Sequence, residues 1–123
     1  MKTRNLTLLL DFYELTMANG FFKENPEKIG YFDLYFRKVP DQGGLVVYTG
    51  LDQVINYLSN LYFSDSDIKF LRQLGTFEEK FLKYLENFDF KCDVWSMKEG
   101  TPAFPNEPLL TVRGPLLQAQ LLE

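Results

Sequence analysis

Residues 10–22, which read LDFYELTMANGFF, constrain this chain more than any other stretch. At 3.6 residues per turn they form a helix with apolar side chains on two adjacent faces, so little of its surface is left for water. One apolar stripe contains Phe12, Leu15, Ala18 and Phe22, and the other contains Tyr13, Met17 and Phe21. Because a small domain easily covers only one such stripe, we expect this helix to have two packing partners.

The composition is that of one globular domain. The 123 residues are 46% hydrophobic and 24% charged, and a chain of this length buries a core without disulfides or metal. Twelve Phe and seven Tyr are more than a small interior hides, so we expect some of them at an interface. The net charge of −4 and the lack of a basic stripe argue against nucleic-acid binding. No apolar run reaches the roughly 20 residues of a membrane-spanning helix, so we expect no membrane association and a cytoplasmic location.

The residue types exclude several kinds of chemistry. Histidine is absent, which excludes a His-based triad, a His general base and a His metal site within this chain. Cys92 is the single cysteine, so an intrachain disulfide is excluded as well. The glycines lack the spacing of a P-loop or a dinucleotide-binding motif. Taken alone, the residue types therefore identify no activity.

Helix signals are clearest in the first three quarters of the sequence. Asp11 and Glu14 form a capping-box pattern at the start of the first helix, which Gly20 or Asn25-Pro26 would end.

Three further short helices are predicted in succession. Apolar residues recur at helical spacing over 51–60 and, from a Ser64 cap, over 64–74. A capping box at Thr76 and Glu79 begins the third, which runs to residue 88. We expect the three helices to form one layer packed against a β-hairpin.

That hairpin is predicted from two strand-like runs. Residues 31–38 are aromatic and partly alternating, residues 45–49 are apolar, and the glycine-containing segment 41–44 separates them. We expect the two strands to pair antiparallel.

The last third of the chain reads as strands followed by a helix. Strands are predicted at 92–97, 103–104 and 108–112, and three prolines in this stretch favour edge or barrel-rim positions. Pro115 then begins a helix without a stop signal, so the sequence looks cut inside it. We expect its apolar face to need a partner outside this chain; the face consists of Leu116, Leu117, Leu121 and Leu122. The element order indicates an α+β fold.

Four residues are candidates for ligand binding, and the residues alone leave two interpretations of each open. Asp11 is a helix cap, a polar site residue, or both. Tyr13 is either a core aromatic or a stacking aromatic. Arg37 and Lys38 precede a glycine loop, where they either hold an anionic group or form a solvated strand end.

Several blocks resemble nicotinate phosphoribosyltransferases in both order and spacing. They are residues 11–17, 32–38, 43–44 with 48–51, 104–110, and 114–116 with 118–123. The resemblance covers the chain and implies a mixed α/β, hammerhead-like N-terminal domain of a type II phosphoribosyltransferase. In that family an α/β barrel follows. The resemblance thus implies that residues 1–114 are the N-terminal domain and that residues 115–123 begin the helix leading into a barrel that is absent here.

The same resemblance implies an activity for the full-length protein. Enzymes of this family join nicotinate to phosphoribosyl pyrophosphate, forming nicotinate mononucleotide for NAD biosynthesis, with Mg2+ and ATP hydrolysis. It implies a homodimer with a shared site, in which Tyr13 meets the neighbour's nicotinate, Asp11 lies nearby, and Arg37 and Lys38 face phosphates. The family's phosphorylated His and metal ligands belong to the barrel, so we expect this fragment alone to be inactive and to bind no cofactor.

A second hypothesis comes from another functional class. The chain could be a stand-alone hammerhead or lipoyl-like binding module without catalysis, with Lys98 at a strand turn as the carrier residue. The helix without a stop signal argues against this alternative.

Overall fold

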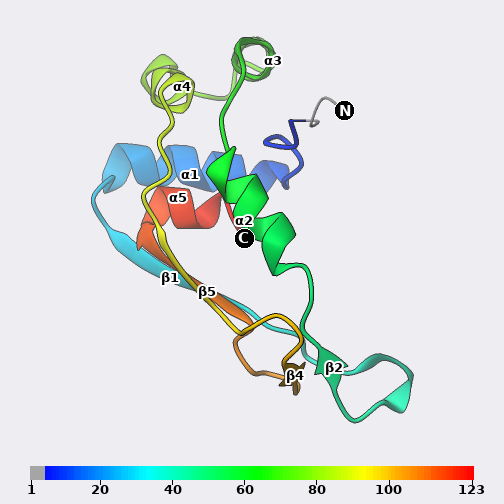
Figure 1. The fold of residues 1–123 in the computed structure, drawn as a ribbon. Helices are drawn as coiled ribbons and strands as arrows, with labels where there is room; N and C mark the ends of the chain where they lie inside the picture. The colour runs from blue at the N-terminus through cyan, green and yellow to red at the C-terminus, as the bar shows by residue number, and fades with distance from the viewer. Residues whose placement is uncertain (1–4) are drawn as a thin grey trace.

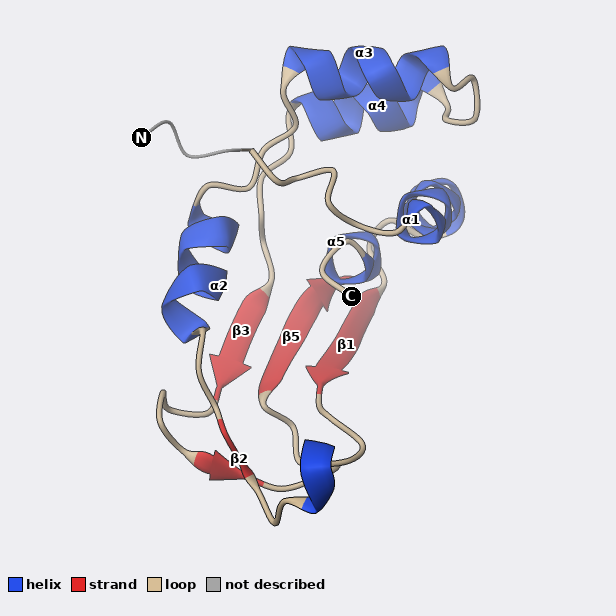
Figure 2. Cartoon of the chain, turned by 90° about the vertical axis from the view of Figure 1, so that its right-hand side faces the viewer, coloured by secondary structure: helices blue, strands red, loops and turns tan. Residues whose placement is uncertain are grey.

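Helices lie on one face of a three-stranded antiparallel sheet in the computed structural model, which describes residues 5–123 (Figures 1 and 2). The predicted α+β class is confirmed, while the first four residues of the predicted N-terminal domain lie outside the described part. The helices are α1 (Phe12–Glu24), α2 (Leu51–Ser59), α3 (Asp65–Gln73), α4 (Glu79–Glu86) and α5 (Leu116–Gln120), with a short 3-10 helix at Pro40–Gln42. The strands are β1 (Ile29–Leu34), β2 (Val46–Val47), β3 (Asp93–Ser96), β4 (Pro102–Ala103) and β5 (Leu110–Pro115).

Helix α1 begins where the capping box predicts. The Asp11 N–H donates to Glu14 Oε2 at 3.2 Å, which satisfies one of the amides that a helix start leaves unpaired. The helix continues through Gly20 and ends at Glu24. Of the two apolar stripes, the first places Leu15 and Ala18 in the core, and its remaining members are less buried.

The main hydrophobic core joins α1 and α5 to the pair formed by α3 and α4 (Figure 2). Its buried members are Leu15, Ala18, Phe63, Ile68, Leu71, Phe81, Leu82, Leu85, Leu117 and Leu121. A smaller cluster of Leu110, Val112 and Ala119 packs between the sheet and α5. The predicted single layer of three helices is therefore wrong: α3 and α4 pack over α1, whereas α2 lies beside β3.

The sheet has the order β1-β5-β3, with both pairs antiparallel. Strand β1 pairs with β5, where Tyr31 lies opposite Arg113, and β2 pairs with β4. The predicted hairpin of β1 with β2 is wrong because the loop after β1 turns the chain away, with positive φ angles at Asp41 and Gln42.

Strand β5 is central, which corrects the expectation of an edge strand. Its side chains alternate, with Leu110 and Val112 buried on the helix side. Two of the prolines, Pro105 and Pro108, precede the strand, and Pro115 ends it, so the amides within the strand remain free to pair. The third proline, Pro102, lies in β4, which belongs to the separate two-stranded sheet.

The helix caps show one success and one failure of the sequence patterns. At α3, Ser64 Oγ accepts from the Asp67 N–H at 3.3 Å and the Ser64 N–H donates to Asp67 Oδ2 at 2.8 Å, as predicted. The capping box predicted at Thr76 is wrong, because the Thr76 hydroxyl donates to the Leu74 carbonyl and α4 begins only at Glu79.

Helix α5 belongs to the core of the described domain. Leu117 and Leu121 are 2% and 5% exposed, and they pack with Leu15 and Ala18 of α1. The expectation that the whole apolar face of this helix lacks a partner within this chain is therefore wrong. Among residues 5–123, no helix combines the length and apolarity required to cross a bilayer.

Candidate functional site

Tyr13 lies in the first turn of α1 on its outward side. Its side chain is 47% exposed, and Phe12 and Met17 beside it are similarly exposed. Within residues 5–123, Tyr13 is therefore not a core aromatic. An exposed ring on a rigid helix offers a planar surface on which another ring can stack.

The carboxyl groups around the start of α1 set its electrostatics. Glu14 is only 6% exposed, and this burial raises the pKa of its carboxyl, as do the charges of Asp11 and Glu123. Partial burial of Tyr13 and then the Glu123 carboxylate raise the pKa of the Tyr13 phenol. Tyr13 therefore remains a neutral phenol at neutral pH.

Asp11 and Glu14 line a cleft of about 910 Å³. Its other walls come from the segment before α1, from β1 and β5, from residues 49–58 and from residues 121–123, and most of their side chains are apolar. Asp11 is exposed as well as being the N-cap of α1, so the structure allows both interpretations of this residue. Tyr13 does not line this cleft.

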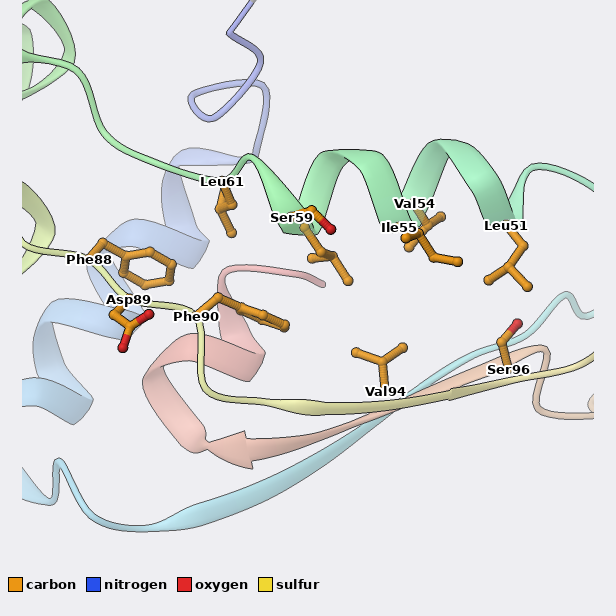
Figure 3. A pocket seen from close by; sticks show the side chains of 11 residues that line it. Leu51, Val54, Ile55, Ser59, Leu61, Phe88, Asp89, Phe90, Val94 and Ser96 are labelled. Atoms are coloured by element: carbon orange, nitrogen blue, oxygen red, sulfur yellow. The ribbon is translucent and has the colours of Figure 1, made fainter.

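A second cavity of about 660 Å³ lies between α2 and the chain from residue 88 to β3. Figure 3 shows Val54 and Ile55 of α2 on one side and Phe90 and Val94 on the other. None of the four candidate residues lines this cavity. Its mostly aliphatic and aromatic walls provide a binding surface but no evident chemistry.

Arg37 and Lys38 occupy a different region of the molecule. The predicted strand 31–38 instead runs from Ile29 to Leu34, so both residues lie in the loop after β1. Both are exposed, and neither forms an ion pair within the described residues. Their charges are therefore available to an anionic group.

The structure does not bring the four candidates together. Asp11 and Tyr13 lie at the N-terminal end of α1, and Asp11 lines the same cleft as Asp33 and Leu34 at the end of β1. Arg37 and Lys38 lie in the loop after β1 and line neither of the two cavities described above (Figure 2). Within the described residues the two pairs thus belong to different elements, the start of α1 and the loop after β1.

A turn that the sequence analysis missed holds the loop that carries Arg37. The Asn106 N–H donates to the Phe36 carbonyl at 2.8 Å. The dipeptide Pro105-Asn106 is a common centre for a β-turn and was the available sequence signal.

The described residues do not fit a Mg2+ site. Residues 5–123 contain no group of three or more Asp, Glu, Cys or His side chains placed to hold a metal ion. Mg2+ requires several oxygen ligands in octahedral geometry, and residues 5–123 do not bring such a set together.

Comparison with known proteins identifies the family. Residues 8–123 match the family model described as the nicotinate phosphoribosyltransferase N-terminal domain. A nicotinate phosphoribosyltransferase of Mycobacterium tuberculosis is 38% identical over 116 residues, covering 94% of this chain and 25% of its own length. The nicotinate phosphoribosyltransferase of Bacillus subtilis is 39% identical over 123 residues, covering 99% of this chain and 25% of its own length.

A solved structure agrees with these sequence matches. The crystal structure of human nicotinic acid phosphoribosyltransferase superposes with a TM-score of 0.82 and 33% identity, covering 92% of this chain and 23% of that one. The chain thus spans about a quarter of the length of the relatives it matches. These matches leave the carrier-module hypothesis, with Lys98 as its carrier residue, without support. The chain therefore belongs to the nicotinate phosphoribosyltransferase family, as its N-terminal domain.

Proposed function

We propose that this chain is the N-terminal domain of an enzyme that forms nicotinate mononucleotide from nicotinate and phosphoribosyl pyrophosphate. The observation that carries the proposal is the exposed Tyr13 at the start of α1, in a domain of this family. The sequence block around it, residues 11–17, is one of those that resemble the family.

The reaction explains what such a residue contributes. The pyridine nitrogen of nicotinate attacks the first carbon of the ribose, whose bond to pyrophosphate breaks with oxocarbenium-like charge on the sugar. Catalysis then requires that ring and sugar be held in line and that the departing pyrophosphate be stabilised. Stacking on Tyr13 would orient the pyridine ring, and Asp11, two residues earlier, would supply a polar group beside it.

Arg37 and Lys38 are proposed to contact phosphate groups. An exposed guanidinium can bind phosphate with two parallel hydrogen bonds, and the Lys38 ammonium adds a second positive charge. Because these residues lie in the loop after β1 and share neither cavity with Asp11 or Tyr13, we propose that other parts of the enzyme complete their sites.

Those other parts are a barrel domain and a second subunit. The exposed stripe of α1, with Tyr13 and Met17, supports a homodimer in which this helix reaches the neighbour's site. We further propose that Mg2+ and ATP bind outside residues 5–123, where the metal ligands would lie, and that the enzyme is cytoplasmic.

The test compares Tyr13→Ala with Tyr13→Phe in the full-length enzyme. Loss of the ring should lower kcat/KM for nicotinate about 5- to 150-fold, corresponding to about 1–3 kcal/mol, whereas Tyr13→Phe keeps the ring and most of the activity. Thermal unfolding should be nearly unchanged in both variants because Tyr13 does not belong to the hydrophobic core of this domain.

A mixing experiment tests whether Tyr13 acts in trans. Mixed dimers of Tyr13→Ala with a variant disabled only in the barrel contain one interface with an intact Tyr13 and an intact barrel, so activity should partly recover. Unchanged nicotinate kinetics in Tyr13→Ala, or mixed dimers without any recovered activity, would contradict the shared-site proposal.

A further inference from the structure

The turn from Phe104 to Glu107 is closed by hydrogen bonds on both sides. The Glu107 N–H donates to the Phe104 carbonyl at 3.3 Å, and the Phe104 N–H donates back to Glu107 Oε2 at 2.9 Å. Asn106 has a φ of 67°. Proline in the second position and a positive φ in the third are the features of a type II turn.

This turn holds the backbone that leads to Arg37. Strand β1 ends at Leu34, whose carbonyl accepts from the Leu109 N–H at 2.8 Å. Two residues further, the Phe36 carbonyl accepts from the Asn106 N–H, also at 2.8 Å. The turn thus continues the pairing of β1 up to the residue immediately before Arg37.

The positive φ of Asn106 directs its backbone N–H at the Phe36 carbonyl. In the left-handed region Asn and Gly are tolerated, whereas β-branched side chains are strongly disfavoured. The Glu107 carboxylate, by accepting from Phe104, holds the two arms of the turn together. Both residues therefore act on the loop through the conformation and hydrogen bonds of the turn.

We propose that Asn106 and Glu107 are positioning residues that fix the backbone from which Arg37 binds a phosphate group of phosphoribosyl pyrophosphate. This inference rests on the proposed function of Arg37. A guanidinium that pairs with phosphate through two hydrogen bonds depends on its orientation, so movement of its backbone weakens binding more than it changes the later chemical step.

The first experiment compares Asn106→Val with Asn106→Gly in the full-length enzyme. Valine disfavours the positive φ, so the KM for phosphoribosyl pyrophosphate should rise about 3- to 30-fold. This is less than the loss of affinity expected when a charged hydrogen bond is removed completely. The KM for nicotinate and the kcat should each change by less than about twofold. Asn106→Gly retains the conformation and should behave like the unmodified enzyme.

A second pair of variants acts through the other side of the turn. Glu107→Ala removes the acceptor for the Phe104 N–H and should raise the same KM, whereas Glu107→Gln retains an acceptor oxygen and should restore most of the affinity. This pair keeps the inference testable if Asn106→Val folds poorly.

Gly75→Val is the matched control for backbone strain. Gly75 has a φ of 66°, in the loop between α3 and α4, and an added Cβ would meet no atom within 4 Å. Valine there carries a similar backbone penalty, so it should lower the melting temperature about as much as Asn106→Val, yet leave the KM for phosphoribosyl pyrophosphate unchanged.

Arg37→Ala separates failure of the inference from failure of the proposed function. If Arg37→Ala leaves the KM for phosphoribosyl pyrophosphate unchanged, the phosphate role of Arg37 is wrong, and the positioning role falls with it. If Arg37→Ala raises that KM but the Asn106 and Glu107 variants behave like Gly75→Val, the positioning role alone is overturned. The positioning role is supported if the KM for phosphoribosyl pyrophosphate rises in Arg37→Ala, Asn106→Val and Glu107→Ala. It should stay nearly unchanged in the three controls, Asn106→Gly, Glu107→Gln and Gly75→Val.

Discussion

Tyr13 and Glu14 are neighbours in the first turn of α1 and have opposite environments. The helix turns Tyr13 outward and Glu14 inward, so the phenol is half exposed while the carboxyl is almost fully buried. The carboxyl pairs with the Asp11 amide through Glu14 Oε2, which offsets part of the free energy lost on removing it from water.

The buried Glu14 makes stability depend on pH. Its pKa in the folded chain is raised above the ordinary value of 4.5, first by burial. The stability that Glu14 contributes is therefore fully present below the unfolded pKa and is lost as the pH rises through the folded pKa. Glu14→Gln keeps an acceptor for Asp11 but cannot ionise. The unfolding free energy of the unmodified chain minus that of Glu14→Gln should therefore fall from about pH 4 to pH 7 in urea titrations.

Glu79→Gln is the control of opposite sign. Hydrogen bonds from Arg72 lower the pKa of the Glu79 carboxyl. The stability from this exposed pair is present above the unfolded pKa and is lost as the pH falls through the folded pKa. A slope of the same sign for Glu14 and Glu79 would show that Glu14 is not buried as described.

At the scale of elements, two glycines let α5 and the chain before β3 approach the sheet. Gly30 of β1 lies opposite Gly114 of β5. A Cβ on Gly30 would lie 2.6 Å from Leu116 Cδ1, and one on Gly114 would lie 2.8 Å from the Cys92 Cα. Real Cβ atoms do not approach backbone so closely, so Gly114 marks a contact that excludes any side chain.

Gly114→Ala and Gly20→Ala should therefore change stability in opposite directions. Alanine at Gly114 overpacks the contact with Cys92 and should lower the unfolding free energy by about 1–3 kcal/mol. Gly20 lies within α1, where an added Cβ meets nothing within 4 Å, so alanine there should raise it by up to about 1 kcal/mol. Chemical denaturation of both variants measures the two effects. Equal destabilisation by both would contradict the contact described here.

At the scale of the whole molecule, the described chain leaves many large apolar side chains exposed, including some on the sheet and some on α1. Tyr31 and Trp95 pair with Arg113 and Thr111, on the sheet face opposite to the buried Leu110 and Val112, and they are 66% and 53% exposed. On α1, Phe12 and Met17 are also exposed. Exposed apolar side chains in such number usually bind another surface.

Residues 1–123 alone are therefore expected to self-associate. Light scattering over a concentration series should show a rising average mass, and Met17→Gln should reduce it because it removes apolar surface from α1. Lys69→Gln, at an exposed polar position on α3, is the control and should have little effect. A monodisperse monomer at high concentration would contradict this expectation.

The helices and most of their caps followed from sequence because their interactions are local. The Asp11–Glu14 and Ser64–Asp67 capping boxes each join residues three apart, so the pattern and the hydrogen bond appear together. The α+β class and the family blocks, including the one that contains Tyr13, were equally visible in the sequence. How Tyr13, Asp11, Arg37 and Lys38 bind ligands stays a prediction.

Pairing between distant segments was not predictable in this way. Strand β1 pairs with β5 and not with β2, which is nearer in sequence. Strand β5 buries Leu110 and Val112 in the core and pairs on both of its edges. The choice depends on burial summed over the whole sheet, which no local pattern contains. For the same reason the tertiary structure alone set the end of β1 at Leu34, the burial of α5, and the attachment of the Arg37 loop to the turn at Asn106.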